Sequence, residues 1–455
     1  MSRWGMLHRF RVRKAYNSRH FERALRLASK KVHHHQHGTF YRDIVIRSLW
    51  SLQRYDEVIQ YSEKWPNSDH HNLSSRATQR KNQTFSATES RYSEPDSLDH
   101  VGWNPDSVVS NWFQLGKRVW FRHPWGWVHW DMPESFELKN THPALLELAS
   151  DVLLRPWVDE VKRPFAKRVK RSGPCGLAWS AGVDSTAAML LLPEDTVLGY
   201  HRRDVPSMID HRNAEATIDY VRDSRREVVV VPSDHELIRT HHSKMIGFST
   251  DYASGVHLIL LADELNLSGI GFGVPIDNSW LAKGASFRNF AKSRHWVMWK
   301  ARFEEAGLDL VLPINHISEA GALRLINTHP VGEVVNSCLR GDGLQGCGRC
   351  WKCFLKNGLM GRTYDVTSTE VRTFLQRRPL RTAQHALYVI KQQGLEDLVP
   401  DLAHHLAQDM TWWEEAYGPG LDLIQSPWRS TVEARTRAMF RVYDESSPLT
   451  QVDLH

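Results

Sequence analysis

The chain has 455 residues, and its 58 basic and 52 acidic side chains give a formal net charge of +6. Hydrophobic residues make up 41% and charged residues 24%, which is ordinary for a globular protein and excludes a disordered or collagen-like chain. No run of about 18 apolar residues occurs and no secretory signal is recognisable, so we expect a cytoplasmic protein of two or three domains without a membrane span.

Residues 1–66 are expected to form a helical arm. The segments "RHFERALRLASKK" (19–31) and "QRYDEVIQYSEKW" (53–65) place Phe21 and Tyr55, and likewise Ala24 and Val58, 34 positions apart. Helix, turn and helix with this period resemble tetratricopeptide repeats, which commonly dock partner proteins. A plain helical hairpin that only mediates oligomerisation is the alternative interpretation.

Two further segments precede the main domain. Residues 67–100 are polar, with few large apolar side chains, and are expected to form a linker. Residues 101–165 should hold a tryptophan-rich hairpin and a helix, because "KRVWFRHPWGWVHWDMP" (117–133) has the pattern of strand, turn and return strand. We expect its tryptophans to pack onto the next domain. The alternative is that they stack on a nucleic-acid base, a partner that a mildly basic chain allows without requiring it.

Residues 166–365 alternate between strand-like and helix-like segments. Short apolar runs occur at 175–179, 196–200, 227–232 and 268–273, and helical stretches lie between them at 185–192, 211–223 and 255–266. This alternation predicts an α/β fold with a doubly wound parallel sheet. Residues 366–455 are expected to form a helical C-terminal region, with its clearest helices at 379–394 and 430–444.

The first of these strands leads into "SAGVDSTAAMLLL" (180–192), a loop of small residues followed by a helix. Such a turn gathers backbone N–H groups and the positive end of a helix around an anion. Ser180, Ser185 and Thr186 add hydroxyl groups, and Asp184 is suited to Mg²⁺ beside bound phosphates. The loop lacks the lysine of GxxxxGK[ST], and a ligand-free, N-capped helix start is the alternative. Its place at the first strand-to-helix turn nevertheless predicts a nucleotide site.

Four of the five cysteines are crowded into "CLRGDGLQGCGRCWKC" (338–353), with the spacing C-x8-C-x2-C-x2-C. Two overlapping C-x2-C steps present thiolates to one ion, and the intervening glycines Gly341, Gly343, Gly346 and Gly348 allow the loop to bend back. The pattern predicts a closed structural zinc site with the ligands Cys338, Cys347, Cys350 and Cys353. Disulfide or redox use is the alternative, and the fifth cysteine, Cys175, falls on the first predicted strand.

Together the two motifs resemble those of one enzyme family. Ser180, Gly182, Asp184 and Ser185 match the SGGxDS loop of the PP-loop ATP pyrophosphatases, whereas Ala181 stands where that family usually has glycine. The cysteine spacing, "FLKNGL" after the last cysteine and "PINHISEAGALRLI" before the first resemble the 7-cyano-7-deazaguanine synthases of this superfamily. The resemblance covers about residues 172–360.

The resemblance implies an ATP-dependent, C–N bond-forming ligase. Members of the family, which serve queuosine biosynthesis, use ATP to adenylate the carboxylate of 7-carboxy-7-deazaguanine, release pyrophosphate, and let ammonia displace AMP to form an amide and then a nitrile. They bind zinc through the four cysteines. The expected cofactors are therefore Zn, Mg and ATP, and the expected small-molecule partners are ATP and a deazaguanine-like base.

The resemblance also implies roles for individual residues. ATP would be bound by Ser180, Ala181, Gly182, Val183, Asp184, Ser185, Thr186, Tyr200 and His201, and the catalytic candidates among them are Asp184, Ser180 and Ser185. The base would be bound by Arg202, His257 and Asp277, whose carboxylate suits the edge of a guanine. Arg203, His211 and Arg212 would neutralise phosphate or carboxylate, or else form a solvated basic turn.

Departures from the family pattern leave the acceptor open. Gly255-Val256-His257 replaces a Gly-Arg-Asn segment, and the family's Asp-Cys-Arg after the fourth strand has no cysteine counterpart here. Relatives with added regions occur in bacterial antiviral defence operons, where the deazaguanine is joined to the amino terminus of a protein, and the helical arm would then present that protein. The alternatives are a tRNA-modifying PP-loop enzyme, which would need a reactive cysteine at the ATP site, and a non-catalytic nucleotide-binding scaffold.

Overall fold

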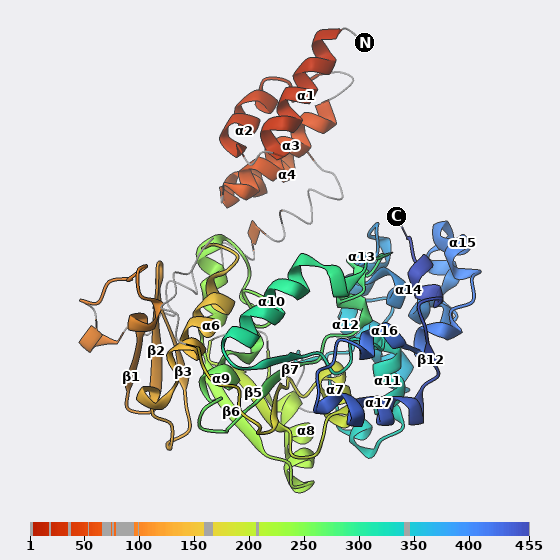
Figure 1. Ribbon diagram of the computed structural model, residues 1–455. Coiled ribbons are helices and arrows are strands. Elements are labelled where there is room, and N and C mark those ends of the chain that lie inside the picture. The colour runs from red at the N-terminus through yellow and green to blue at the C-terminus, as the bar shows by residue number, and fades with distance from the viewer. Residues whose placement is uncertain are drawn as a thin grey trace. The chain divides into compact units, whose positions relative to one another are not determined.

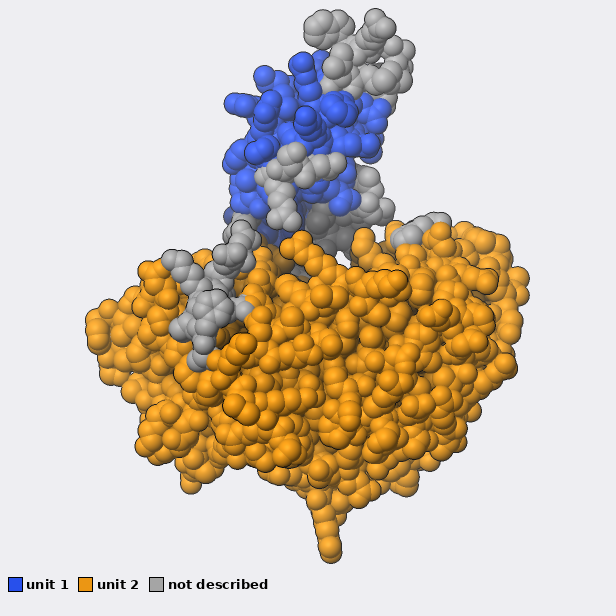
Figure 2. Space-filling model, in the orientation of Figure 1, with its two compact units in different colours: residues 1–96 blue, residues 97–455 orange. Residues whose placement is uncertain are grey.

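The computed structural model describes residues 3–17, 20–34, 38–52, 54–65, 74, 77–78, 95–98, 100–158, 167–205, 209–340 and 346–454. The chain divides into two compact units, residues 1–96 (unit 1) and residues 97–455 (unit 2), which Figure 2 distinguishes by colour. Most of the predicted linker, 67–100, and part of the segment after residue 158 lie outside the described residues. No helix among the described residues is long and apolar enough to cross a membrane.

Unit 1 is helical in its described residues. Its helices are α1 (Arg3–Asn17), α2 (Phe21–Ser29), α3 (Gly38–Ser51) and α4 (Tyr55–Lys64). Helices α2 and α4 begin 34 positions apart, and the equivalent residues Ala24 and Val58 are both fully buried in the core of the unit. The helix-turn-helix pattern thus buries the residues that the repeat aligns, while the tetratricopeptide assignment itself remains a prediction.

Unit 2 is built on an eight-stranded sheet with the order β1-β2-β3-β6-β5-β4-β7-β10 (Figure 1). Its parallel strands are β4 (Cys175–Ala178), β5 (Val197–Arg203), β6 (Val228–Ser233), β7 (Gly269–Phe272) and β10 (Asp309–Val311). When these five strands are numbered in chain order, they lie side by side in the order 3-2-1-4-5. The direction of the order therefore reverses between β4 and β7. The predicted parallel sheet is therefore confirmed, and the first four strands match the apolar runs at 175–179, 196–200, 227–232 and 268–273.

The tryptophan-rich hairpin extends this sheet. Strands β1 (Trp112–Leu115), β2 (Arg118–His123) and β3 (Gly126–Asp131) are antiparallel, and β3 joins β6 through the pair Trp130 and Ser233. Trp112, Trp120, Trp127 and Trp130 are all at most 5% exposed. Trp112 and Trp130 belong to the hydrophobic core that also contains Ile270 of β7, so the expectation that the tryptophans pack onto the next domain is confirmed for these two. Their burial stabilises this end of the sheet, because large aromatic rings leave water.

Helices cover both faces of the parallel strands, and the side chains of each strand alternate between two cores. One core contains Leu258, Ile270 and Phe272, with α6 (Pro143–Leu154), α9 (Val256–Leu260) and α10 (Arg294–Glu305). The other contains Leu177, Leu198 and Ala187, with α7 (Val183–Leu191), α8 (Arg212–Asp223), α11 (Glu319–Asn327) and α17 (Trp428–Met439). Burial on both faces explains why the central strands β4 and β7 contain no polar side chain except that of Cys175.

The C-terminal region packs into these same cores. Its helices are α12 (Trp351–Asn357), α13 (Thr369–Gln376), α14 (Ala383–Gln392), α15 (Ala403–Leu406), α16 (Gly418–Leu421) and α17. Two small sheets pair β8 (Leu281–Ala282) with β9 (Ser286–Phe287) and β11 (Ala416–Tyr417) with β12 (Val442–Tyr443). Phe374 and Ala386 share one core with the sheet strands, and Trp428 and Val432 share the other. Unit 2 therefore includes the predicted helical tail.

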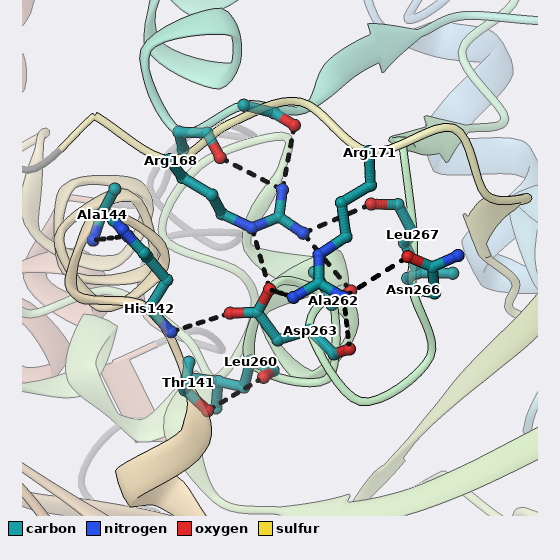
Figure 3. Close-up of polar contacts among 12 residues, drawn as sticks. Thr141, His142, Ala144, Arg168, Arg171, Leu260, Ala262, Asp263, Asn266 and Leu267 are labelled. Carbon is teal, nitrogen blue, oxygen red and sulfur yellow. Dashed lines mark hydrogen bonds and ion pairs between the residues drawn. The ribbon is translucent and has the colours of Figure 1, made fainter.

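A buried arginine fastens the segment that enters β4 (Figure 3). The guanidinium of Arg168 donates through Nε to Asp263 Oδ1 at 3.0 Å and through Nη1 to the carbonyl of Gly307 at 2.9 Å. Arg171 also contacts Asp263 Oδ1, at 2.7 Å, and the amide of His142 donates to Asp263 Oδ2 at 2.8 Å. Asp263 thus ties the start of α6 to the entry of the central strand.

Candidate active site and metal centre

The predicted nucleotide loop connects β4 to α7 and folds on its own serines. The amide of Ser180 donates to Ser185 Oγ at 3.1 Å, and the two hydroxyl oxygens are 3.0 Å apart. Thr186 is fully buried, its hydroxyl accepts from the indole of Trp179 at 3.1 Å, and its amide donates to the carbonyl of Gly182 at 2.9 Å, so both groups already have partners within the fold. The first amides of a helix have no intrahelical acceptor, which makes this turn suitable for an anion.

Ala181 has a strained, left-handed backbone conformation. Its φ is +56°, in the left-handed region, where a residue with a Cβ costs roughly 1 kcal/mol or more. The residue is fully buried and belongs to the same core as Ala187 and Leu177. Packing of the methyl group therefore offsets part of the backbone strain, and the loop keeps its shape without a glycine.

The loop lies where the strand order reverses. In doubly wound sheets, ligands bind at the carboxyl edge beside this point. Gly273 follows β7 there, and a Cβ on it would lie 2.8 Å from Ser185 Cα. The segment after β7 therefore lies so close to the start of α7 that this position requires a glycine.

Three acidic residues follow three neighbouring strands at this edge. Asp184 follows β4, Asp277 follows β7 and Glu319, the first residue of α11, follows β10. Asp277 is 1% exposed, and its Oδ2 accepts from the amide of Glu319 at 2.8 Å. Burial and the charge of Glu319 raise the pKa of Asp277 well above its usual value, which favours its protonated form.

A lysine from α12 joins this row of acids. The ammonium of Lys356 lies 2.8 Å from both carboxylate oxygens of Asp184 and 3.4 Å from Glu319 Oε2. Burial alone would lower the pKa of Lys356, but the two carboxylates outweigh burial and raise it. His385 on α14 is fully buried, and its Nε2 lies 3.3 Å from the carbonyl of Leu355 and 3.8 Å from Glu319 Oε2. The result is a charged cluster of Asp184, Glu319 and Lys356 backed by buried polar groups.

The four clustered cysteines form a candidate metal centre. The Sγ–Sγ distances are 3.7 Å for Cys338 and Cys347, 3.6 Å for Cys338 and Cys350, 3.9 Å for Cys347 and Cys353, and 3.6 Å for Cys350 and Cys353. A tetrahedral site with Zn–S bonds of about 2.3 Å places its sulfurs about 3.8 Å apart. The cluster could therefore hold one zinc ion, with all four positions taken by sulfur.

The backbone around the centre follows its sequence pattern. Gly348 has a φ of +65°, and a Cβ on Gly346 would lie 2.9 Å from Cys338 Cβ, so both positions need glycine. Gly341 and Gly343 lie outside the described residues. Cys175 is fully buried on β4, and burial raises the pKa of its thiol, so it is unsuited to act as a nucleophile.

The candidate metal centre contacts the predicted nucleotide loop on both sides. Ser337, directly before Cys338, accepts a hydrogen bond from the amide of Val183 at 2.9 Å. Lys356, three residues after Cys353 on α12, pairs with Asp184. The two consecutive residues at the start of α7 are thus held by residues that flank the cysteine cluster, and a metal that orders the cluster would also order the loop.

The other predicted ATP residues lie on both faces of β5. Tyr200 is 2% exposed, and its hydroxyl is 2.7 Å from His211 Nδ1 on the face of α7. His201 faces the opposite core, where its Nε2 is 3.1 Å from Glu236 Oε1. Arg202 is half-exposed and lies 3.6 Å from Glu215. The structure therefore brings Tyr200 to the same face as the loop but directs His201 away from it.

The other residues that were predicted to bind the base, phosphate or carboxylate do not gather around the loop as free groups. His257 is fully buried on α9, and within the described structure neither ring nitrogen has a hydrogen-bond partner. Burial lowers its pKa to about 3. Asp277 lies in the acidic row instead of lining an open surface. Arg203 and Arg212 already pair with Glu236 and Asp210.

A second group of possible metal ligands lies near the junction of β3 and β6. Ligand atoms of His129, Asp131 and Asp204 lie within 4.8 Å of one another. Arg118 already pairs with Asp131 at 2.6 Å, and His129 contacts Asp204 at 3.1 Å. These ion pairs balance the carboxylates without an ion, so we interpret this group as a structural cluster.

Comparisons with known proteins match only part of the chain, and they assign no function to it. Residues 298–447 match a family of unknown function (DUF6395). The match includes Glu319, Lys356 and the four cysteines, and it excludes the loop at 180–186. Neither the comparison with curated proteins nor that with solved structures gave a match.

Proposed function

We propose that this protein is an ATP-dependent enzyme that adenylates the carboxylate of a 7-deazaguanine-like substrate, releases pyrophosphate and transfers the activated acyl group to a nitrogen nucleophile. The observation that carries the proposal is the position of Asp184 and the 180–186 loop at the carboxyl edge of the sheet, beside the point where the strand order reverses. The PP-loop likeness of the motif and the four-cysteine centre add to it.

The residues of the loop suit the proposed reaction. The positive end of α7 would attract phosphate, and the hydroxyls of Ser180 and Ser185 would bind phosphate oxygens. The carboxylate of Asp184 is 30% exposed and would hold Mg²⁺, which supplies positive charge to the phosphates. The buried ring of Tyr200 would line the nucleotide site on the face of the sheet that α7 covers. The four cysteines, with no open coordination position, would have a structural role.

The chemistry balances with ATP and an amine alone. A carboxylate oxygen attacks the α-phosphorus, the bond to the bridging oxygen breaks, and pyrophosphate leaves with the electron pair. The nitrogen nucleophile then attacks the acyl carbon, AMP leaves, and the surplus proton on nitrogen passes to solvent. The protein contributes positioning and positive charge at the leaving group, which are the main terms for phosphoryl chemistry.

Product analysis tests this proposal. The full-length protein is incubated with Mg²⁺, ATP, 7-carboxy-7-deazaguanine and an ammonium salt as the nitrogen source, and the nucleotides are separated by ion exchange. We expect AMP and pyrophosphate in equal amounts, dependent on the acid. ADP and phosphate as the products would contradict the PP-loop assignment.

A protein acceptor is the second candidate, in the manner of the antiviral-defence relatives. The observation that favours it is unit 1, which has its own helical core and is not needed to build the α/β sheet. Ammonia needs no capture by a separate unit, whereas a protein does. A tRNA-thiolating role is disfavoured, because Cys175 is buried and the other cysteines lie together. A scaffold without activity would fail the product analysis.

A further inference from the structure

The nucleotide loop has no lysine of its own, yet an ammonium group lies against it. Lys356 is 172 positions from Asp184 in sequence, and its Nζ lies 2.8 Å from each of the two carboxylate oxygens of Asp184. Lysine near phosphates supplies the positive charge that phosphoryl chemistry requires. Helix α12 therefore places at the loop the residue type that the loop sequence lacks.

Burying the ammonium of Lys356 costs desolvation free energy, which its carboxylate partners offset. Its side chain is 8% exposed, and an unpaired ammonium would not remain charged there. It has two carboxylate partners of different character. Glu319 is 10% exposed and lies behind the ammonium at 3.4 Å, whereas Asp184 is 30% exposed and is the partner open to solvent. Glu319 is thus the permanent counter-ion, and Asp184 is the partner that can be exchanged.

A ligand at the loop would compete for both members of the outer pair. Mg²⁺ attracts the carboxylate of Asp184, and phosphate oxygens attract the ammonium of Lys356. The pair can therefore separate without leaving either charge unpaired, since Glu319 still faces Lys356.

We propose that Lys356 is a catalytic residue of this site: its ammonium exchanges Asp184 for phosphate oxygens of the nucleotide bound at the 180–186 loop, while Glu319 retains it. The inference rests on the proposed function and adds to it the cation that neutralises the leaving pyrophosphate. It also gives the four-cysteine centre a task, because Cys353 lies one turn before Lys356 on α12 and fixes the start of that helix.

The test compares phosphate-dependent binding in matched variants of the full-length, zinc-loaded protein. Lys356→Met removes the charge, Lys356→Arg keeps it, and Lys300→Met removes a charge on α10 that pairs with Glu304 one turn along the same helix. The affinities for ATP, ADP, AMP and adenosine are measured by calorimetry with Mg²⁺, together with the rate of ATP–pyrophosphate exchange.

We expect Lys356→Met to weaken ATP binding by about tenfold or more and to slow exchange by about 100-fold, with adenosine binding unchanged. Lys356→Arg should recover part of the exchange, and Lys300→Met should match the wild type. Lys356→Met leaves the carboxylates of Asp184 and Glu319 facing each other without a cation between them. If this variant does not fold, the double variant Lys356→Met/Glu319→Gln, which removes one of the two charges, replaces it in the test. Zinc content and thermal unfolding check the fold of each.

Three results would overturn the inference, and they differ in what they say of the proposed function. Wild-type ATP affinity and exchange in Lys356→Met would remove the role of Lys356 and leave the proposed function standing. Equal weakening of ATP, AMP and adenosine would mean that Lys356 is only structural. A wild-type protein that binds no ATP would overturn the proposed function, and this inference with it.

Discussion

Arg168 illustrates how single buried charges hold unit 2 together. Its side chain is 3% exposed, and its guanidinium donates to Asp263 and to backbone carbonyls of segments around residues 262–267 and 306–307. Removing one partner of such a buried pair typically costs about 3–5 kcal/mol, because the other groups remain buried and unpaired. We predict that Arg168→Met lowers the free energy of unfolding of unit 2 by that amount, measured by urea denaturation followed by tryptophan fluorescence.

Arg171 provides the matched control, because it contacts the same Asp263 carboxylate from the surface. Its side chain is 42% exposed, and exposed ion pairs contribute about 0–1 kcal/mol. Arg171→Met should therefore change stability little. Equal effects of the two substitutions would show that burial of Arg168 does not matter.

Glu236 gives a prediction for pH dependence. Burial would raise its pKa, but hydrogen bonds from His201 and Arg203 outweigh burial and lower the pKa from 4.5 to about 2. A lowered carboxyl pKa contributes stability above the unfolded value, and this contribution is lost as the pH falls from about 4.5 toward 2. The shift corresponds to about 3 kcal/mol.

The Glu236→Gln variant isolates this contribution. The stability difference between wild type and variant should be largest at pH 6 and should shrink as the pH falls below 4.5. Urea denaturation of both proteins at several pH values measures it, and zinc release in acid affects both alike. A difference that stays constant between pH 6 and 3 would contradict the assignment.

At the residue scale, the sequence predicts residues that lie together in a short motif, but not residues that reach the site from distant parts of the chain. Asp184 and the cysteines stand in short patterns whose spacing reflects one turn of backbone, so the sequence predicts which residues lie together. Lys356 and Glu319 reach the site from different elements, and only the fold brings them to Asp184. The signal that could have found Glu319 is its position after β10, a strand of three residues that the apolar pattern did not reveal.

Helix α12 connects the candidate metal centre to the predicted nucleotide loop, because it carries both Cys353 and Lys356. We predict about one zinc per chain in the purified protein, and loss of that zinc in Cys350→Ser, because three ligands bind zinc far more weakly than four. The freed start of α12 should then displace Lys356 and weaken ATP binding. Metal analysis and calorimetry measure the two effects.

Cys175→Ala is the control for this prediction, since Cys175 is buried on β4 and lies outside the cluster. It should retain zinc and ATP binding. Folded wild-type protein without metal would refute the zinc assignment.

At the element scale, the sequence predicts regular segments better than their pairing. The predicted strands match β4 to β7 closely, because β-branched apolar runs between helices have few other uses. The hairpin at 117–133 was also recognisable. Its attachment to β6 was not, because it depends on one bridge between Trp130 and Ser233 and on the bond from Ser233 Oγ to the carbonyl of His129 at 2.6 Å.

At the scale of the whole molecule, the two compact units should be separable. Unit 1 has its own buried core, including Ala24, Ile46 and Val58, and among the described residues the cores around the sheet are made of residues of unit 2. We predict that a protein starting at residue 97 folds, binds zinc and supports ATP–pyrophosphate exchange. If unit 1 captures a protein acceptor, this truncated protein should fail to modify that acceptor, as detected by mass spectrometry.

Two outcomes would argue against the capture role. The truncated protein could modify the partner as efficiently as the full chain, or the full chain could make free nitrile from ammonia efficiently without any partner. The first result would leave the protein acceptor but remove the role of unit 1 in capturing it. The second would leave the ATP chemistry intact and identify the protein as a plain nitrile synthase.

The central claim is that the site at the carboxyl edge of the sheet cleaves ATP between its α- and β-phosphates. ATP–pyrophosphate exchange tests it most directly, because labelled pyrophosphate enters ATP only if adenylation is reversible on the protein. We predict exchange that requires 7-carboxy-7-deazaguanine and Mg²⁺ and that is abolished in Asp184→Asn, whose zinc content and thermal unfolding should match the wild type. Exchange that persists in Asp184→Asn, or none in the zinc-loaded wild-type protein, would contradict the account.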